Sequence, residues 1–272
     1  MMHIVKYRWD SGEPVMVVAE RGELHAVPVM DHLFAHTVGE RRCIGYMRSG
    51  KHVPCPDNAA VDGGWYCEPC VNRDSFFLCV RCDGSDCKNE KRREQCKKEK
   101  YYIYLSAFGP VLKVGISNQF RLVPRLVEQG ADMAARIALV QDGKEARLLE
   151  QHIKACLNIV DRVDGLRKHQ LLGADPNAPA VRIAAALEEL KEAQLLVDRP
   201  AIYDLRSFYR LDRVRAAPSF LQLSAGQDIN GTVVAAKGNL LILENSGAYS
   251  SFNAHELIGR TITSQEERLC NF

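Results

Sequence analysis

Long hydrophobic runs are missing from this sequence of 272 residues. Hydrophobic residues make up 46% of it, yet no run approaches the ~18 consecutive apolar residues that a membrane-spanning helix needs. The opening residues, Met1 to Trp9, also contain no apolar stretch of signal-peptide length. We therefore expect a cytoplasmic protein with no membrane partner.

Several familiar catalytic patterns are absent as well. The sequence contains no phosphate-binding loop, no GxGxxG dinucleotide motif and no credible Ser-His-Asp set. It has no internal repeat of fixed period and no low-complexity tract. Charge of one sign is scarce, because 36 Lys and Arg nearly balance 34 Asp and Glu, giving a net charge of +2. Any affinity for nucleic acid must therefore come from local patches of charge.

Cysteine, by contrast, is abundant and clustered. Eight of the ten cysteines lie between Cys43 and Cys96. They include two Cys-x-x-Cys pairs, and such a pair can supply half of a tetrahedral zinc site. A reducing compartment disfavours disulfides, so the cluster indicates metal binding. The segment has few core-forming residues, and metal binding would supply the folding free energy that so small a core lacks.

The simplest grouping gives two closed, structural zinc sites with four ligands each. The expected ligands are Cys43, Cys55, Cys67 and Cys70 at one ion and Cys79, Cys82, Cys87 and Cys96 at the other. An interleaved pairing is also open, and His52 could replace Cys55. Disulfides, an iron–sulfur cluster and free buried thiols are the alternative states. Eight zinc-bound thiolates would lower the net charge to about −2.

Patterning along the chain predicts an α+β protein with β-rich N- and C-terminal segments. A three-strand β meander is expected over residues 1–38, and the two-site zinc module over 39–100. A small antiparallel sheet with flanking helices is expected over 101–175, a helix over 176–200 and a small β domain over 201–272.

Two basic stretches are candidates for nucleic-acid contact. Residues 88–100 hold seven Lys or Arg against three Glu. Residues 199–215 hold five Arg against two Asp, with Phe208 and Tyr209 interleaved. Such charge runs are equally typical of a solvated face, and those near the cysteines could offset the negative charge of four-thiolate zinc sites.

The 101–175 segment begins with a predicted hairpin, whose strands are 101–105 and 111–116 and whose turn is Gly109-Pro110. Side chains alternate along a strand, so the apolar residues of this hairpin share one face, which we expect to meet the core. The polar residues could then form one exposed surface: Tyr102, Tyr104, Lys113, Gly115 and Ser117.

This segment resembles the core of the GIY-YIG nucleases. The resemblance rests on Tyr-Ile-Tyr-Leu, a turn and Leu-Lys-Val-Gly-Ile-Ser, followed by an Arg and by a helix with a Glu. It implies a three-stranded antiparallel sheet and one site in which the Glu holds a divalent ion, usually magnesium. Water activated at that site would cut a phosphodiester.

Carried over residue by residue, the resemblance assigns a site to this chain. Tyr104 matches the Tyr of the first half-motif, with Tyr102 as the alternative. Arg125 matches the helix Arg, with Arg121 as the alternative. Glu150 matches the Glu that would bind magnesium.

The sequence departs from the GIY-YIG pattern at two positions. Tyr102 occupies the slot of the first Gly, and Lys113 replaces the second Tyr. Val114-Gly115 matches the Ile-Gly of the second half-motif. Divergent branches of the superfamily resemble this Lys-Val-Gly form, and Lys113 would add a positive charge to the site.

A larger resemblance covers about residues 43–172. The eight-cysteine front and an ordered set of motifs are similar to the prokaryotic domain-of-unknown-function family 2797, which implies no particular activity. The motifs are Leu112–Ser117, Pro124-Arg125, Glu128-Gln129-Gly130-Ala131, Leu149-Glu150 and Arg167-Lys168.

Two functions of different classes follow from these patterns. The first is a magnesium-dependent endonuclease acting on DNA or RNA, with catalytic residues Tyr104, Tyr102, Lys113, Arg125 and Glu150. The second is an inactive nucleic-acid or ribonucleoprotein adaptor that grips phosphate through Lys113, Arg121, Arg125 and Arg167. A protein–protein scaffold is a third, weaker hypothesis.

Overall fold

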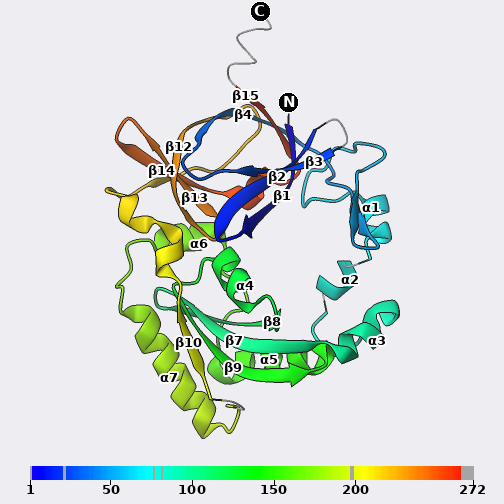
Figure 1. Ribbon diagram of the computed structural model, residues 1–272, viewed down its shortest axis with the longest axis vertical. Helices are drawn as coiled ribbons and strands as arrows, with labels where there is room; N and C mark the ends of the chain where they lie inside the picture. Colours follow the sequence, from blue (N-terminus) through cyan, green and yellow to red (C-terminus); the bar gives the residue numbers. More distant parts are fainter. Residues whose placement is uncertain (1, 21–22, 76, 81, 197–198, 265–272) are drawn as a thin grey trace, which may run out of the picture. The chain divides into compact units, whose positions relative to one another are not determined.

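The computed structural model describes residues 2–20, 23–75, 77–80, 82–196 and 199–264. In these ranges the chain is a mixed α+β protein with seven α-helices and with fifteen strands in three sheets (Figure 1). None of the helices described there is long and apolar enough to cross a bilayer. The chain divides into two compact units, Met1–Phe77 with Arg210–Phe272, and Leu78–Tyr209.

The first unit is built on a nine-stranded sheet of order β11-β14-β13-β12-β4-β15-β1-β2-β3. The strands are β1 (Met2–Asp10), β2 (Glu13–Glu20), β3 (Glu23–Pro28), β4 (Leu33–Arg41), β11 (Ser219–Phe220), β12 (Asp228–Lys237), β13 (Leu240–Asn245), β14 (Ala248–Asn253) and β15 (Arg260–Ser264). Strands β1, β2 and β3 are consecutive antiparallel neighbours, and β12 pairs with β13 in an antiparallel hairpin.

The N- and C-terminal β segments share this sheet instead of forming separate domains. Strand β4 pairs with β12 on one side and with β15 on the other. A central strand hydrogen-bonded on both edges cannot be divided from its neighbours, which is why residues 1–38 and the part of the expected C-terminal segment that follows Tyr209 lie in one unit. Residues 201–209, with β10, belong to the second unit. The expected zinc module 39–100 is in turn divided between the two units, at Phe77.

The rest of the first unit carries the first four clustered cysteines. It consists of a small hairpin, a short helix and two 3₁₀ turns: β5 (Tyr46–Arg48), β6 (Lys51–Val53), α1 (Glu68–Arg73), η2 (Leu211–Arg213) and η3 (Ala254–Leu257). Asn253 caps η3 by accepting a hydrogen bond from the His255 backbone N–H at 3.0 Å.

The second unit is built on a four-stranded antiparallel sheet of order β10-β9-β7-β8. Its strands are β7 (Lys100–Phe108), β8 (Val111–Asn118), β9 (Met133–Gln141) and β10 (Ala201–Asp204). Its remaining elements are α3 (Glu90–Lys98), α4 (Leu122–Gln129), α5 (Gly143–Leu157), α6 (Gly165–Gln170), α7 (Ala178–Glu192) and η1 (Arg206–Tyr209), while α2 (Phe77–Val80) begins at the boundary.

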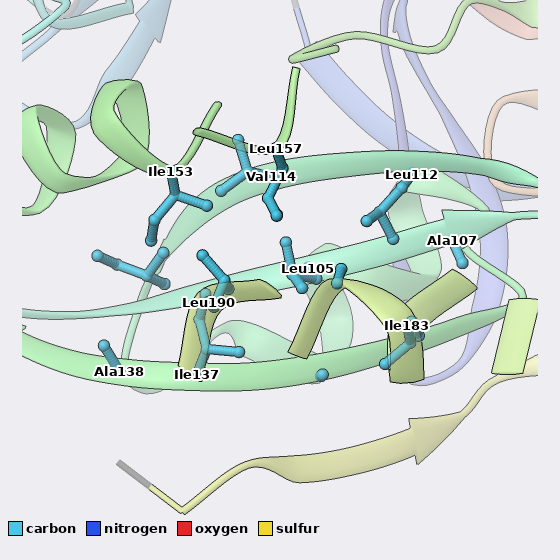
Figure 2. Close-up of a cluster of buried hydrophobic side chains, with 13 residues drawn as sticks. Leu105, Ala107, Leu112, Val114, Ile137, Ala138, Ile153, Leu157, Ile183 and Leu190 are labelled. Carbon is cyan, nitrogen blue, oxygen red and sulfur yellow. The ribbon is translucent and has the colours of Figure 1, made fainter. Parts of the chain in front are cut away.

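The apolar face of this sheet forms a core with two helices. Leu112 and Val114 of β8 and Leu105 of β7 are buried there, as their alternation in sequence predicts. Ile153 and Leu157 of α5 and Ile183 and Leu190 of α7 pack onto the same face (Figure 2). This core fixes the position of α5, and hence of its Glu150.

A β-bulge in β9 changes the register of the sheet beside Tyr104. Ile103 pairs with Ala138, but Tyr104 pairs with Arg136, so Ile137 is the extra residue. Ile137 and its neighbour Ala138 consequently both belong to the buried core (Figure 2). The bulge also places Arg136 beside the two tyrosines, and its guanidinium carbon lies 4.9 Å from the Tyr102 ring centroid.

The polar face of the hairpin is covered, which corrects the expectation of an exposed surface. Tyr104 is 1% exposed, and Lys113 and Ser117 are also buried. The reason is that α4 contributes a hydrogen-bond acceptor to this face: the Gln129 side chain binds both Tyr104 and Lys113. The helix ends there because Gly130 adopts the left-handed conformation that terminates helices, with φ of 78°.

Candidate functional site

The first four cysteines form a compact cluster in the first unit. Cys43 follows β4, Cys55 follows β6, and Cys67 and Cys70 lie one turn apart at the start of α1. Their four sulfur atoms all lie within 4.8 Å of one another. The group assembles as the sequence analysis expects, with Cys55 and not His52 as its member. His52 instead has its Nε2 against the Ile44 carbonyl.

The spacing of these sulfurs fits a tetrahedral zinc ion. Four sulfurs at about 2.3 Å from zinc would be about 3.8 Å apart, and the Sγ atoms of Cys55 and Cys67 are 3.8 Å apart. In addition, the Sγ of Cys43 accepts hydrogen bonds from the backbone N–H groups of Gly45 and Cys67, at 3.4 and 3.2 Å. Such N–H groups stabilise a thiolate, the form that binds zinc. The cluster could therefore hold a metal ion such as zinc.

Burial disfavours the thiolate form at two of these cysteines. Burial raises the pKa of the Cys43 and Cys70 thiols, and nearby sulfurs raise that of Cys70 further. At Cys55 burial acts in the same direction, but backbone N–H groups of Ala59 and Asp57 outweigh it and lower the pKa. Four thiolates in so small a volume repel one another, and a divalent cation would remove that cost.

The second four cysteines lie in the second unit, where Cys79 and Cys96 contact α5. Arg147 of α5 donates to the Cys79 carbonyl at 3.1 Å, and the Asn89 side chain donates to the Cys79 sulfur at 3.2 Å. The Cys96 sulfur lies against Gly143, where an added Cβ would be 2.6 Å from it. In the described ranges these four do not gather into a group like that of the first four, so their zinc site stays a prediction.

A second polar cluster lies on the covered face of β7 and β8. The Tyr104 hydroxyl and the Lys113 ammonium both donate to Oε1 of Gln129, at 3.2 and 3.0 Å. Arg125 lies one turn before Gln129 on α4, and its charge acts on both the Tyr104 hydroxyl and Lys113. The structure thus brings Tyr104, Lys113 and Arg125 together.

Glu150 of α5 joins this cluster electrostatically. It is 9% exposed, and its charge acts on both Tyr104 and Lys113. Burial raises the pKa of its carboxyl, although the charges of Arg147 and Lys113 oppose that shift. Lys154, one helical turn after Glu150, forms an ion pair with Asp161 at 2.5 Å. An ordinary Glu150–Lys154 ion pair along the helix therefore does not explain the position of Glu150.

Lys113 is the most perturbed base of the cluster. Burial and the nearby charge of Arg125 lower its pKa to about 8, while Glu150 and Asp161 raise it. Tyr104 has a raised pKa because it is buried, and the charge of Arg125 only partly offsets this. At neutral pH the tyrosine is therefore a neutral donor, whereas the lysine titrates close to neutrality.

The other residues expected to contact phosphate differ in their surroundings. Arg121 is exposed and pairs with Glu128 at 3.0 Å. Arg167 is exposed on α6, where it donates to the Gln170 side chain. Tyr102 lies on β7 two residues before Tyr104, the tyrosine that binds Gln129. Its ring lies against the guanidinium of Arg136.

Three of the five arginines of the basic stretch 199–215 form ion pairs. Arg206 pairs with Asp204, and in the first unit Arg210 and Arg213 both pair with Asp31. Tyr209 is buried, and its hydroxyl donates to the Ala131 carbonyl at 2.7 Å. The interpretation of 199–215 as a solvated, internally paired surface is therefore favoured over that of a nucleic-acid patch.

Two members of the polar cluster were not assigned from the sequence. Gln129 lies in the Glu128–Ala131 motif, but its role depends on how α4 docks. Asp161 follows Val160, which forms a parallel bridge with Lys113 at the free edge of β8. This bridge joins residues distant in the chain, and the charge of the Asp161 carboxylate acts on Lys113.

Comparison with known proteins adds a family and no activity. A search of the curated proteins and a search of the solved structures each find no match. Among protein families, one described as "Protein of unknown function (DUF2797)" matches residues 33–262. That range includes both the cysteine cluster and the Tyr104 cluster. The chain is therefore a member of the DUF2797 family.

Proposed function

We propose that this chain is a zinc-stabilised protein that binds nucleic acid through the cluster of Tyr104, Lys113, Arg125 and Glu150. The observation that carries the proposal is the convergence of Lys113 and Arg125 beside the Tyr104 hydroxyl. Two cations near the same hydroxyl, one on β8 and one on α4, suit a phosphate, because each can donate charge-assisted hydrogen bonds to its oxygens.

Arg125 is the residue of the cluster best suited to first contact. It is exposed, whereas Lys113 behind it is 9% exposed. The salt bridges found in the described ranges include Arg121–Glu128 but none to Arg125. A guanidinium without a carboxylate partner can bind phosphate without first breaking an ion pair.

The GIY-YIG resemblance supports the same assignment. Strands β8, β7 and β9 form an antiparallel sheet, with the Arg on the following helix α4 and the Glu on α5. This is the order of elements that the resemblance implies. Gly115 and Tyr104, which match the two half-motifs, pair across the hairpin.

The second candidate is a magnesium-dependent endonuclease, which the charge of Glu150 on Tyr104 and Lys113 favours. Glu150 and Asp161 would hold the ion, which supplies positive charge to the phosphate when bound. Tyr104 would donate a hydrogen bond, because its pKa is raised. Lys113, with a pKa of about 8, is the group in the cluster able to take a proton from water near neutrality.

Binding is tested by fluorescence anisotropy with labelled DNA and RNA oligonucleotides, as single strands and as duplexes. We expect salt-dependent binding that Arg125→Ala weakens. Arg182→Ala is the matched control, because Arg182 is an exposed arginine on α7. If no oligonucleotide binds, or if binding is insensitive to salt, the proposal fails.

Cleavage is tested on the same oligonucleotides with and without added Mg²⁺. Chelators are avoided because they would also remove zinc. We expect Glu150→Ala to abolish any Mg²⁺-dependent cleavage while zinc content and circular dichroism stay unchanged. Equal cleavage by this variant would disprove the site, and binding without cleavage by the wild type would favour the adaptor.

We also propose a second structural zinc held by Cys79, Cys82, Cys87 and Cys96. All four lie in the second unit, and the contacts of Cys79 and Cys96 with α5 bring both to the same turn of that helix. A zinc there would fix α3 against α5 and thereby support the helix that carries Glu150. Metal analysis should then give about two zinc ions per chain.

A further inference from the structure

The turn between β8 and α4 presents an isolated aromatic ring to solvent. Phe120 is 82% exposed, the highest value among the large hydrophobic residues described. Aromatic rings are normally at least partly buried, because exposing one forgoes a hydrophobic gain of about 2 kcal/mol. This ring stands directly before Arg121, the residue that caps α4.

The backbone holds Phe120 in this position. Its N–H donates to the Asn118 side chain at 3.1 Å, and the N–H of Arg121 donates to the Asn118 carbonyl at 2.9 Å. The preceding residue, Gln119, donates its N–H to the Lys100 carbonyl of β7 at 3.1 Å. These bonds tie the turn to the sheet, so the backbone holds Phe120 at the surface.

The ring stands at the end of a polar ridge on α4. Arg121, Arg125 and Gln129 follow one another at intervals of four residues, so they lie along one face of the helix. Gln129 and Arg125 reach the Tyr104 hydroxyl. From Gln129 toward the start of α4, the ridge holds Arg125 and then Arg121, and Phe120 directly precedes Arg121.

We propose that Phe120 is a stacking platform for an unpaired nucleobase, so that the nucleic acid bound by this protein is single-stranded at this point. The inference rests on the proposed nucleic-acid binding and extends it by naming the form of the nucleic acid. A base stacked on Phe120 would leave its phosphates next to Arg121 and Arg125. A paired base inside a duplex cannot present its face to the ring.

The positive charges beside Phe120 favour a nucleobase over an apolar protein partner as the group that binds its ring. The ring is followed by two exposed arginines, and this pattern of aromatic and basic residues is typical of single-strand binding surfaces. The stacking of a base on an aromatic side chain is insensitive to sequence, since every base has a π face. The surface therefore suits a strand of any sequence.

The test compares single strands with blunt duplexes of the same sequence. We expect Phe120→Ala to weaken single-strand binding about 5- to 100-fold, which corresponds to the loss of one stacked base, and to leave duplex binding unchanged. Val181→Ala is the matched control, because Val181 is also exposed, on α7. Thermal melting of each variant checks the fold, which an exposed side chain should not alter.

A second variant reports stacking directly. Phe120→Trp should keep single-strand affinity, and its added fluorescence should be quenched when a strand binds. Val181→Trp should show no such quenching. The two natural tryptophans, Trp9 and Trp65, lie in the other unit and provide a common background.

The outcomes separate this inference from the proposed function. If the wild type binds nucleic acid but Phe120→Ala binds single strands equally well, the stacking platform is wrong and the phosphate site stands. If Phe120→Ala weakens single strands and duplexes equally, the preference for unpaired bases is wrong. If the wild type binds no nucleic acid, both proposals fail.

Discussion

The ring of Tyr104 lies directly over Gly115 on the neighbouring strand. The two residues pair across the β7-β8 hairpin, and a Cβ built on Gly115 would lie 2.5 Å from the Tyr104 hydroxyl oxygen and 2.6 Å from the ring carbon that bears it. The absent side chain of Gly115 is what lets the hydroxyl reach Gln129 and Arg125. The glycine therefore shapes the polar cluster although it contributes no polar side chain.

Replacement of Gly115 should disturb this cluster. We expect Gly115→Ala to lower the free energy of unfolding by about 1–3 kcal/mol, because the new methyl group forces the Tyr104 ring to move within a packed region. It should weaken nucleic-acid binding as well. Urea unfolding followed by far-UV circular dichroism gives the first quantity, and anisotropy gives the second.

Gly173→Ala is the control for this prediction. A Cβ at Gly173 would have no atom within 4 Å, so this change should leave the free energy of unfolding within about 0.5 kcal/mol of the wild type. If Gly115→Ala is equally harmless, the ring of Tyr104 does not occupy the space over the glycine.

The hairpin around these residues could be predicted from local sequence, whereas the surroundings of its polar face could not. Alternation of apolar and polar residues places Leu112 and Val114 toward the core, and Gly109-Pro110 marks the turn. The burial of Tyr104 depends instead on α4 docking over it. That docking brings together residues 25 positions apart, Tyr104 and Gln129, which no local pattern encodes.

The same contrast between local patterns and long-range contacts explains the other differences between the predicted and the observed fold. The pairing of β4 with β12 and β15 joins segments about 190 to 230 residues apart, and strand order of this kind is not determined by the pattern of a single strand. The bulge at Ile137 likewise depends on the facing strand. Metal-ligand spacing was more informative, because Cys-x-x-Cys pairs have few structural uses in a reducing compartment.

Metal content should follow the two groups of cysteines. We expect Cys70→Ser to lose one zinc and to destabilise the first unit, because Cys70 is 0% exposed and its group lies within a small core. Cys82→Ser should lose the other zinc and retain the first. Elemental analysis gives the metal content, and fluorescence of Trp9 and Trp65 reports the first unit.

Cys156→Ser is the control for the cysteine variants, because Cys156 is exposed on α5 and outside both groups. It should change neither metal content nor stability. One zinc per chain in the wild type would disprove the second site. A folded wild type with no zinc and with eight reactive thiols would disprove both.

The charge of Lys113 predicts a pH dependence of binding. Its pKa is lowered from 10.5 to about 8, so the ammonium is largely present at pH 7 and largely lost at pH 9. If Lys113 contacts phosphate, affinity should fall about 3- to 10-fold over this interval. Anisotropy titrations at fixed ionic strength measure the change.

Lys113→Arg is the matched variant, because arginine keeps its charge throughout this range. Its binding should vary less between pH 7 and pH 9 than that of the wild type.

The free energy of unfolding should change with pH in the opposite direction to the affinity for nucleic acid. Between pH 8 and 10.5 the unfolded state binds more protons at Lys113 than the folded state does, so this residue makes folding more favourable as pH rises. Identical pH profiles of nucleic-acid binding for the wild type and Lys113→Arg would contradict a role of Lys113 in binding.

Asp142 joins the end of β9 to both α3 and α5, and its replacement should loosen both contacts. It caps α5 by accepting a hydrogen bond from the Lys144 N–H at 2.8 Å, and it pairs with Arg93 of α3 at 2.5 and 2.6 Å. Asp142→Ala should cost about 1 kcal/mol for the lost cap alone, and more because its φ of 76° disfavours a non-polar side chain. Asp142→Asn keeps the cap acceptor and tolerates this backbone, so it isolates the effect of the charge.

The charge of Asp142 also predicts a pH dependence of stability. The hydrogen bonds from Arg93 lower the pKa of Asp142, so its contribution to the free energy of unfolding is present above the ordinary carboxyl pKa and is lost as pH falls below it. The difference in unfolding free energy between wild type and Asp142→Asn, measured by urea unfolding, should therefore shrink from pH 7 to pH 3, and a constant difference would show that the Arg93 pair does not stabilise the fold.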